Sequence, residues 1–182
     1  MESVDPQGPT GPADTPPSSA PDFNVLLIED NPVDALYFIE NLRLAFNVYS
    51  ADTLANGIEK LGQVTVHCII LDLCLPDAHG LEVIRKVREA FLKIPIVVVT
   101  SYVFDEDEVI SAGAQDYIKK TELWPARLLK IVKLAIVRDQ AEKKYRPLAS
   151  HVEELRKDFN ETVKAINGGK PPPLTAPGTP PS

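Results

Sequence analysis

The 182-residue sequence lacks features that would place it in several large classes of protein. No apolar stretch approaches the roughly 20 residues that a membrane-spanning helix needs. The first residues have neither the basic start nor the apolar core of a signal peptide. The net charge is −7 and no run of basic residues occurs, so nucleic acid is not expected as the main partner. These absences favour a cytoplasmic protein that does not enter a membrane.

Cysteine is scarce, with only Cys68 and Cys74 in the chain. Both stand among apolar residues, and their spacing is not that of the paired cysteines in common metal sites. A disulfide framework is therefore not expected. We interpret both as reduced packing residues, which also agrees with a cytoplasmic location.

Proline is abundant, and many of the 17 prolines gather near the two ends of the chain. Residues 1–22 and 169–182 have no apolar periodicity and cannot bury a core, so both are predicted to be disordered tails. The remaining length suits one domain of ordinary size. We assign this domain to residues 23–144 and a helical extension to residues 145–168.

Short apolar segments alternate with segments of helical spacing between residues 23 and 144. Strands are predicted at 23–29, 47–51, 66–72, 94–101 and 115–120. Helices are predicted to begin near residues 32, 52, 80, 105 and 124, the last of them ending near residue 144. This alternation predicts an α/β fold, a five-stranded parallel sheet with helices on both faces.

Polar residues follow four of the predicted strands, at the edge where such sheets form binding sites. They are Glu29 and Asp30, Asp72, Thr100, and either Lys119 or Lys120. Neighbouring carboxylates repel one another unless a cation is present, and oxygen ligands of this kind favour Mg²⁺. With a hydroxyl and an ammonium beside them, they predict a phosphoryl-binding site in which Asp72 is the nucleophile.

Four motifs, in this order and spacing, resemble the receiver domain of two-component response regulators. They are LLIEDNP, ILDLCLPDAHGLEVIRKVR, VVVTS and GAQDYIKK, and the resemblance covers residues 23–144. It implies a doubly wound, flavodoxin-like sheet. It also implies a stand-alone response regulator, which at most catalyses its own phosphorylation and dephosphorylation and is otherwise no enzyme.

The resemblance also assigns the metal and acceptor roles. Asp72 would be the phosphoacceptor, and Asp30 would bind Mg²⁺ directly. Glu29 would act through a water molecule, and the backbone carbonyl of Cys74 would be a further ligand. Pro76 and Gly80 match the loop that follows the acceptor in this family.

The same resemblance implies a switch. Thr100 would bond the phosphoryl group, and Tyr117 would be the aromatic residue that turns inward. The family lysine follows this aromatic by three residues, which favours Lys120 over Lys119. Many receivers have proline after that lysine, whereas this chain has Thr121, so the usual cis bond is not expected.

By this resemblance, a sensor histidine kinase or a phosphotransfer protein donates the phosphoryl group from a phosphohistidine. The output partner is an unknown protein, because no DNA-binding or catalytic domain is recognisable. Two alternatives remain. In one, the chain is an interaction module whose phosphorylation is vestigial; in the other it is an aspartyl phosphatase, which requires an aspartate where Cys74 stands.

A second helical pattern follows Pro147. Apolar residues recur at intervals of three and four at Val152, Leu155, Phe159, Val163 and Ile166. The helix could fold back on the receiver, form a homodimer through residues 148–167, or dock on another protein. The residues around His151 loosely resemble a kinase phosphohistidine motif, but an ordinary polar helix residue is favoured.

Overall fold

The computed structural model describes residues 21–168. The tails predicted to be disordered lie outside this range, apart from residues 21 and 22. The described chain divides into two compact units, with the boundary between Ala135 and Ile136. None of the helices in residues 21–168 combines the length and the apolar character of a membrane span.

The first unit contains a sheet of five parallel strands, as predicted. The strands are β1 (Asn24–Ile28), β2 (Asn47–Ala51), β3 (Cys68–Leu71), β6 (Ile96–Thr100) and β7 (Asp116–Lys119). Their spatial order is β2-β1-β3-β6-β7. The winding therefore reverses between β1 and β3, and a doubly wound sheet forms its site where such neighbouring strands end.

Within residues 21–168, five α-helices connect and follow the strands. They are α1 (Pro32–Leu42), α2 (Leu54–Gln63), α3 (Leu81–Ala90), α4 (Glu106–Ser111) and α5 (Pro125–Asn167). Polar side chains fix three of the starts: Asn31 accepts from the amides of residues 33 and 34, Thr53 from residue 56, and Asp105 from residue 108. Each cap satisfies backbone donors that the first helical turn leaves free.

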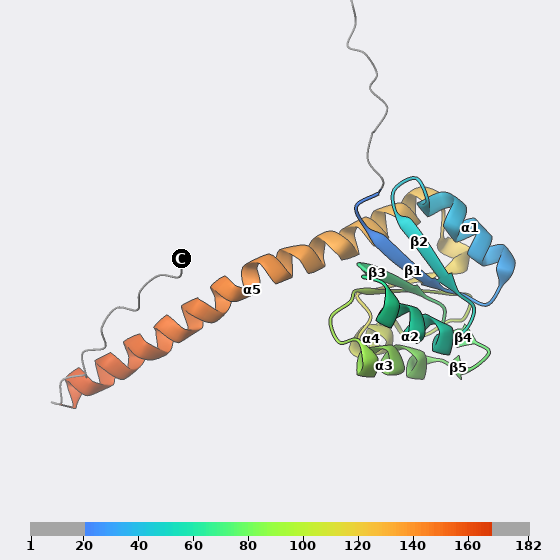
Figure 1. Ribbon diagram of the computed structural model, residues 1–182. Coiled ribbons are helices and arrows are strands. Elements are labelled where there is room, and N and C mark those ends of the chain that lie inside the picture. The colour runs from blue at the N-terminus through green and yellow to red at the C-terminus, as the bar shows by residue number, and fades with distance from the viewer. Residues whose placement is uncertain (1–20, 169–182) are drawn as a thin grey trace, which may run out of the picture. The chain divides into compact units, whose positions relative to one another are not determined.

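Successive strand residues are buried on opposite faces of the sheet. Leu26 and Ile28 belong to a core cluster that includes residues of α2, α3 and α4. Val25 and Leu27 are also fully buried. Because strand side chains alternate, they face the other side of the sheet, where Figure 1 shows α1 and the first turns of α5. Because helices cover both faces of the sheet, β1 has no polar face.

Three local features differ from the sequence-based prediction. The loop after β3 contains a two-stranded antiparallel ribbon, β4 (Cys74–Leu75) with β5 (Ala78–His79). A short 3₁₀ turn, η1 (Lys120–Glu122), follows β7. Finally, α5 continues through Pro147 as one helix of 43 residues, where a break was predicted. An interior proline removes one backbone hydrogen bond and crowds one turn, and long helical segments on both sides sustain the helix here.

Candidate functional site

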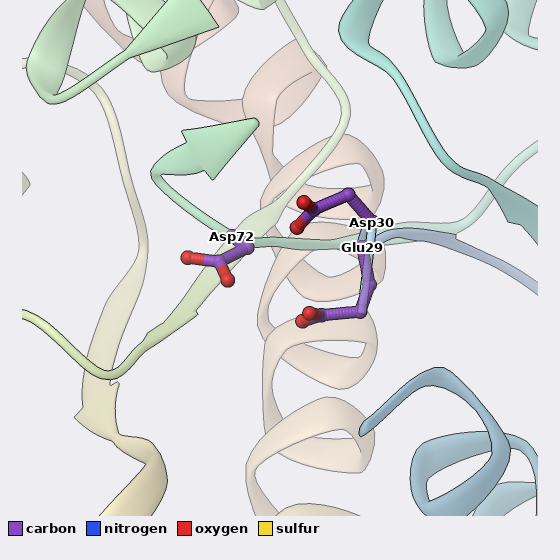
Figure 2. Close-up of side chains that lie close together, drawn as sticks. All are labelled: Glu29, Asp30 and Asp72. Atoms are coloured by element: carbon purple, nitrogen blue, oxygen red, sulfur yellow. The ribbon is translucent and has the colours of Figure 1, made fainter. Parts of the chain in front are cut away.

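Three predicted carboxylates meet where β1 and β3 end. Glu29 and Asp72 are buried, with 3% and 5% of their surface exposed, whereas Asp30 is exposed. One oxygen from each of the three side chains lies within 4.8 Å of the others. Figure 2 shows Glu29 and Asp30 extending from the same strand end toward the space beside Asp72. The backbone fixes this arrangement, because the amide of Asp72 donates to the carbonyl of Ile28 over 3.0 Å.

A lysine reaches into these carboxylates from the end of β7. Lys120 Nζ lies 2.8 Å from Glu29 Oε1 and 2.7 Å from Asp72 Oδ2, and donates to both. The Lys119 side chain is more exposed, and its Nζ lies 4.0 Å from Glu122 Oε1. The structure therefore brings Lys120, and not its neighbour, to the site.

Asp34 is a member of this site that was not predicted from the sequence. It lies in the first turn of α1, and its Oδ2 accepts from Lys120 Nζ over 2.8 Å. The available signal was its position three residues after the capping Asn31. That position puts Asp34 in the helix turn nearest the end of β1, with the strand-end carboxylates.

Burial and the ion pairs perturb the charges of the site. Burial raises the pKa of Glu29 to about 7, although the hydrogen bond from Lys120 opposes this effect. Burial alone would lower the pKa of Lys120, but hydrogen bonds to Asp34, Asp72 and Glu29 outweigh it and raise that pKa above its ordinary value. One ammonium thus faces several carboxylates, and the local potential favours a further cation.

The donor set fits a divalent metal ion such as Mg²⁺. Glu29 Oε2 is buried and has no hydrogen-bond partner within residues 21–168. It forms an ion pair with Lys120 Nζ at 2.7 Å, and the same nitrogen donates a hydrogen bond to Oε1 of this carboxylate. A buried oxygen in this state, beside two more carboxylates, is suited to a hard cation or to its water.

The Asp72 carboxylate is held from two sides. The amide of Cys74 donates to Oδ1 over 3.1 Å, while Lys120 donates to Oδ2. Cys74 belongs to the ribbon, and its thiol sulfur lies 3.9 Å from His79 Nδ1. Both carboxylate oxygens of Asp72 therefore have fixed directions.

Thr100 and Tyr117 are connected through the loop before α4. Thr100 is fully buried, and its hydroxyl oxygen accepts from the amide of Tyr102 over 3.4 Å. The Tyr117 ring is 9% exposed; its hydroxyl donates to the Tyr102 carbonyl and accepts from the Phe104 amide, each over 3.1 Å. Tyr102 thus contacts both predicted switch residues, and the ring of Tyr117 lies inward.

Comparison with known proteins places this architecture among signalling domains. The family model of the response regulator receiver domain matches residues 25–133. Among curated proteins, the cell cycle response regulator CtrA of Brucella ovis and its counterpart in Brucella abortus are 38% identical over 101 residues. These alignments cover 54% of this chain but only 44% of either relative, so the match spans less than half of their length.

Solved structures agree with the family match. A receiver domain protein of the CheY-like kind from Methanospirillum hungatei shares the fold with a TM-score of 0.61 at 24% identity, over 66% of this chain and 98% of that one. The BeF₃-activated receiver domain of RstA from Klebsiella pneumoniae is 27% identical, with a TM-score of 0.57, over 62% of this chain and 97% of that one. The family match ends inside α5, at residue 133.

Proposed function

The chain belongs to the family of response regulator receiver domains, and from that premise we propose that phosphorylation of Asp72 switches it as a two-component signalling protein. The observation that carries this proposal is the set of bonds at Asp72. Its two oxygens are held by Cys74 and Lys120, beside two further carboxylates that suit a metal ion. A buried acid that only capped a strand would need none of these neighbours.

The proposed reaction transfers a phosphoryl group from a phosphohistidine to an Asp72 oxygen. The P–N bond breaks as the P–O bond forms, and the imidazole keeps the electron pair of the broken bond. Glu29, Asp30 and Asp72, with the backbone carbonyl of Cys74, would hold Mg²⁺, which supplies positive charge beside the transferred group. The fixed carboxylate of Asp72 contributes orientation, the main task of a protein in this kind of transfer.

Lys120 and Thr100 would then bind the new phosphoryl group. Lys120 already donates to the acceptor carboxylate, so a small movement brings its ammonium to a phosphoryl oxygen. Thr100 would donate its hydroxyl from the end of β6. Because Tyr102 bonds to both Thr100 and Tyr117, a shift of Thr100 changes the loop that precedes α4. Phosphorylation would favour one of two loop states that already exist.

We assign the donor to a sensor histidine kinase or a phosphotransfer protein in the cytoplasm. The output is a protein contact, made by the surface of α4, β7 and α5 or by residues 148–167, which would bind a second copy or another protein. Most large apolar side chains of the latter segment are exposed, which supports a role in binding.

The test is the intact mass of the protein after incubation with acetyl phosphate, with and without Mg²⁺. We expect the wild type to gain one phosphoryl group only when the metal is present, and Asp72→Asn to gain none. Asp107→Asn removes an exposed carboxylate from the first turn of α4 and should label like the wild type. Equal labelling of Asp72→Asn and the wild type would refute Asp72 as the acceptor.

A further inference from the structure

An apolar stripe follows one side of α5 within the second compact unit. Its largest members are more than half exposed: Tyr145 57%, Leu148 61%, Val152 56%, Leu155 54%, Phe159 68% and Ile166 64%. Nothing within residues 21–168 covers them. An exposed apolar surface of this length on one helix indicates a binding surface.

The spacing of the stripe points to another helix as its partner. Steps of three and four alternate without interruption through residues 138, 141, 145, 148, 152, 155, 159, 162 and 166, which we call the seam. These eight steps span 28 residues, a mean of 3.5, and this is the period at which two helices keep contact by supercoiling. Because α5 is continuous, the seam covers about four heptads. Pro147 lies outside the seam.

We infer that the seam binds a second copy of this chain, with the two helices antiparallel. In a parallel pair each seam residue would face its own counterpart, so Arg138 would meet Arg138 and two like charges would be buried together. In the antiparallel pair that aligns residues 138–162 of the two copies, Arg138 faces Thr162 of the second copy, and the small Ala141 faces the large Phe159. Ile166 lies beyond this overlap. Polar residues then meet polar residues, and the volumes of the facing side chains complement each other.

The central layers of this antiparallel pair are entirely apolar. Tyr145 faces Leu155 of the second copy, and Leu148 faces Val152. Each pairing occurs twice because the dimer has twofold symmetry. The seam is thus complementary to itself in this direction, which favours a second copy over an unrelated protein as its occupant.

Charges beside the seam select the same direction. In the antiparallel register Lys144 lies beside Asp158 of the second copy, and Glu142 lies beside Arg156. Glu142 already accepts from Arg146 of its own helix over 2.6 Å, so Arg156 would be its second cation. A parallel register would instead put Lys144 beside Ala149 and Asp158 beside Val163. Only the antiparallel arrangement therefore gives both flanking carboxylates a cation from the second copy.

This inference rests on the proposed function only in treating the exposed face of α5 as a binding surface, and it does not depend on phosphorylation. Asp72→Asn should therefore dimerise as the wild type does. A loss of phosphorylation with an intact dimer would count against the proposed function alone. A monomeric wild type that still accepts phosphate would count against the dimer alone.

The experiment is sedimentation velocity of the full-length chain over a range of concentrations. We expect a dimer for the wild type, and about tenfold weaker association for either Lys144→Asp or Asp158→Lys. The double variant Lys144→Asp/Asp158→Lys should regain the affinity of the wild type, because it restores both pairs with reversed sign. Lys157→Asp makes the same charge change on the outer face of the helix and serves as the matched control. It should leave association unchanged.

A second pair of variants tests the seam itself. Ala141→Phe should place two large rings in one layer and weaken the dimer, and Phe159→Ala should leave that layer underfilled. The combination Ala141→Phe/Phe159→Ala exchanges the two residues and should restore association. A monomer at every concentration would overturn the inference. A dimer in which neither double variant recovers affinity would overturn the antiparallel direction.

Discussion

Apolar side chains are usually buried and charged side chains exposed, and the strand-end site and the second half of α5 depart from this rule in opposite ways. At the strand ends, two carboxylates are buried beside a partly buried ammonium, where apolar side chains would normally lie. Along α5, apolar side chains are exposed where charged ones would normally lie. A buried charge is costly without a partner, and so is an exposed apolar stripe. Each region is therefore best understood as half of an interaction, the first with a cation and a phosphoryl group, the second with another helix.

The largest effect on stability should come from removing the cation of the first region. Lys120→Ala leaves Glu29 and Asp72 buried without their ammonium, and we expect the free energy of unfolding to fall by about 3 kcal/mol without metal. Lys119→Ala removes only a long and more exposed contact, and should cost less than about 1 kcal/mol. Urea unfolding of both variants measures the difference. Equal losses would show that the buried ion pairs are not the important contacts.

The affinity for Mg²⁺ should distinguish the roles of Asp30 and Asp34 in the site. Asp30→Asn should lower the affinity for Mg²⁺ by at least about tenfold, because it removes a charged ligand from the cluster. Asp34→Asn should change it far less, since Asp34 contacts Lys120 and lies outside that cluster. Isothermal titration with Mg²⁺ compares the two variants. If Asp34→Asn lost as much affinity as Asp30→Asn, the metal would have to lie nearer α1.

A smaller loss of stability should follow from removing the hydrogen bonds that hold the loop before α4. Tyr117→Phe keeps the buried ring but removes the hydroxyl that bonds to Tyr102 and Phe104. We expect stability to fall by about 1 kcal/mol and amide hydrogen exchange to become faster in residues 101–104. Tyr49→Phe is the matched control, since it removes the same hydroxyl from an exposed side chain on β2, at the opposite edge of the sheet from β7. Unchanged exchange in Tyr117→Phe would mean that these bonds do not hold the loop.

The smallest effect on the unfolding of a single chain should come from the second region. Leu155→Ala alters an exposed side chain, so we expect a change within about 0.5 kcal/mol at concentrations where the chain is monomeric. Ile84→Ala, in the core of the first unit, should cost about 3 kcal/mol. Urea unfolding of the two variants in dilute solution tests this. A large loss for Leu155→Ala in the monomer would show that the stripe packs within its own chain.

The sheet and most of the site residues could be predicted because both depend on local patterns. The apolar runs before Glu29 and Asp72 define buried strands, and parallel strands that end together bring the residues after them to one edge. Helices were predicted to begin near residues 32 and 52, and the side chains of Asn31 and Thr53 cap helices at these places. These signals need no knowledge of distant contacts, and the structure agrees with them.

Asp34 and the continuity of α5 were not predictable in the same way. Asp34 reaches Lys120 because α1 packs with its first turn beside the strand ends, and packing between distant segments sets that orientation. Pro147 is a local signal for the end of a helix. Its cost of about 3 kcal/mol is offset by the long helical segments on both sides. In both cases the outcome depends on interactions beyond the neighbouring residues, and a local sequence pattern does not contain them.

The most direct test of the central claim is to identify the phosphorylated residue itself. The protein is phosphorylated with acetyl phosphate and Mg²⁺, reduced with borohydride, which converts an aspartyl phosphate to homoserine, and then digested and sequenced by mass spectrometry. We predict homoserine at position 72 and at no other aspartate. Homoserine at Asp30 or Asp34 in place of position 72 would contradict the account.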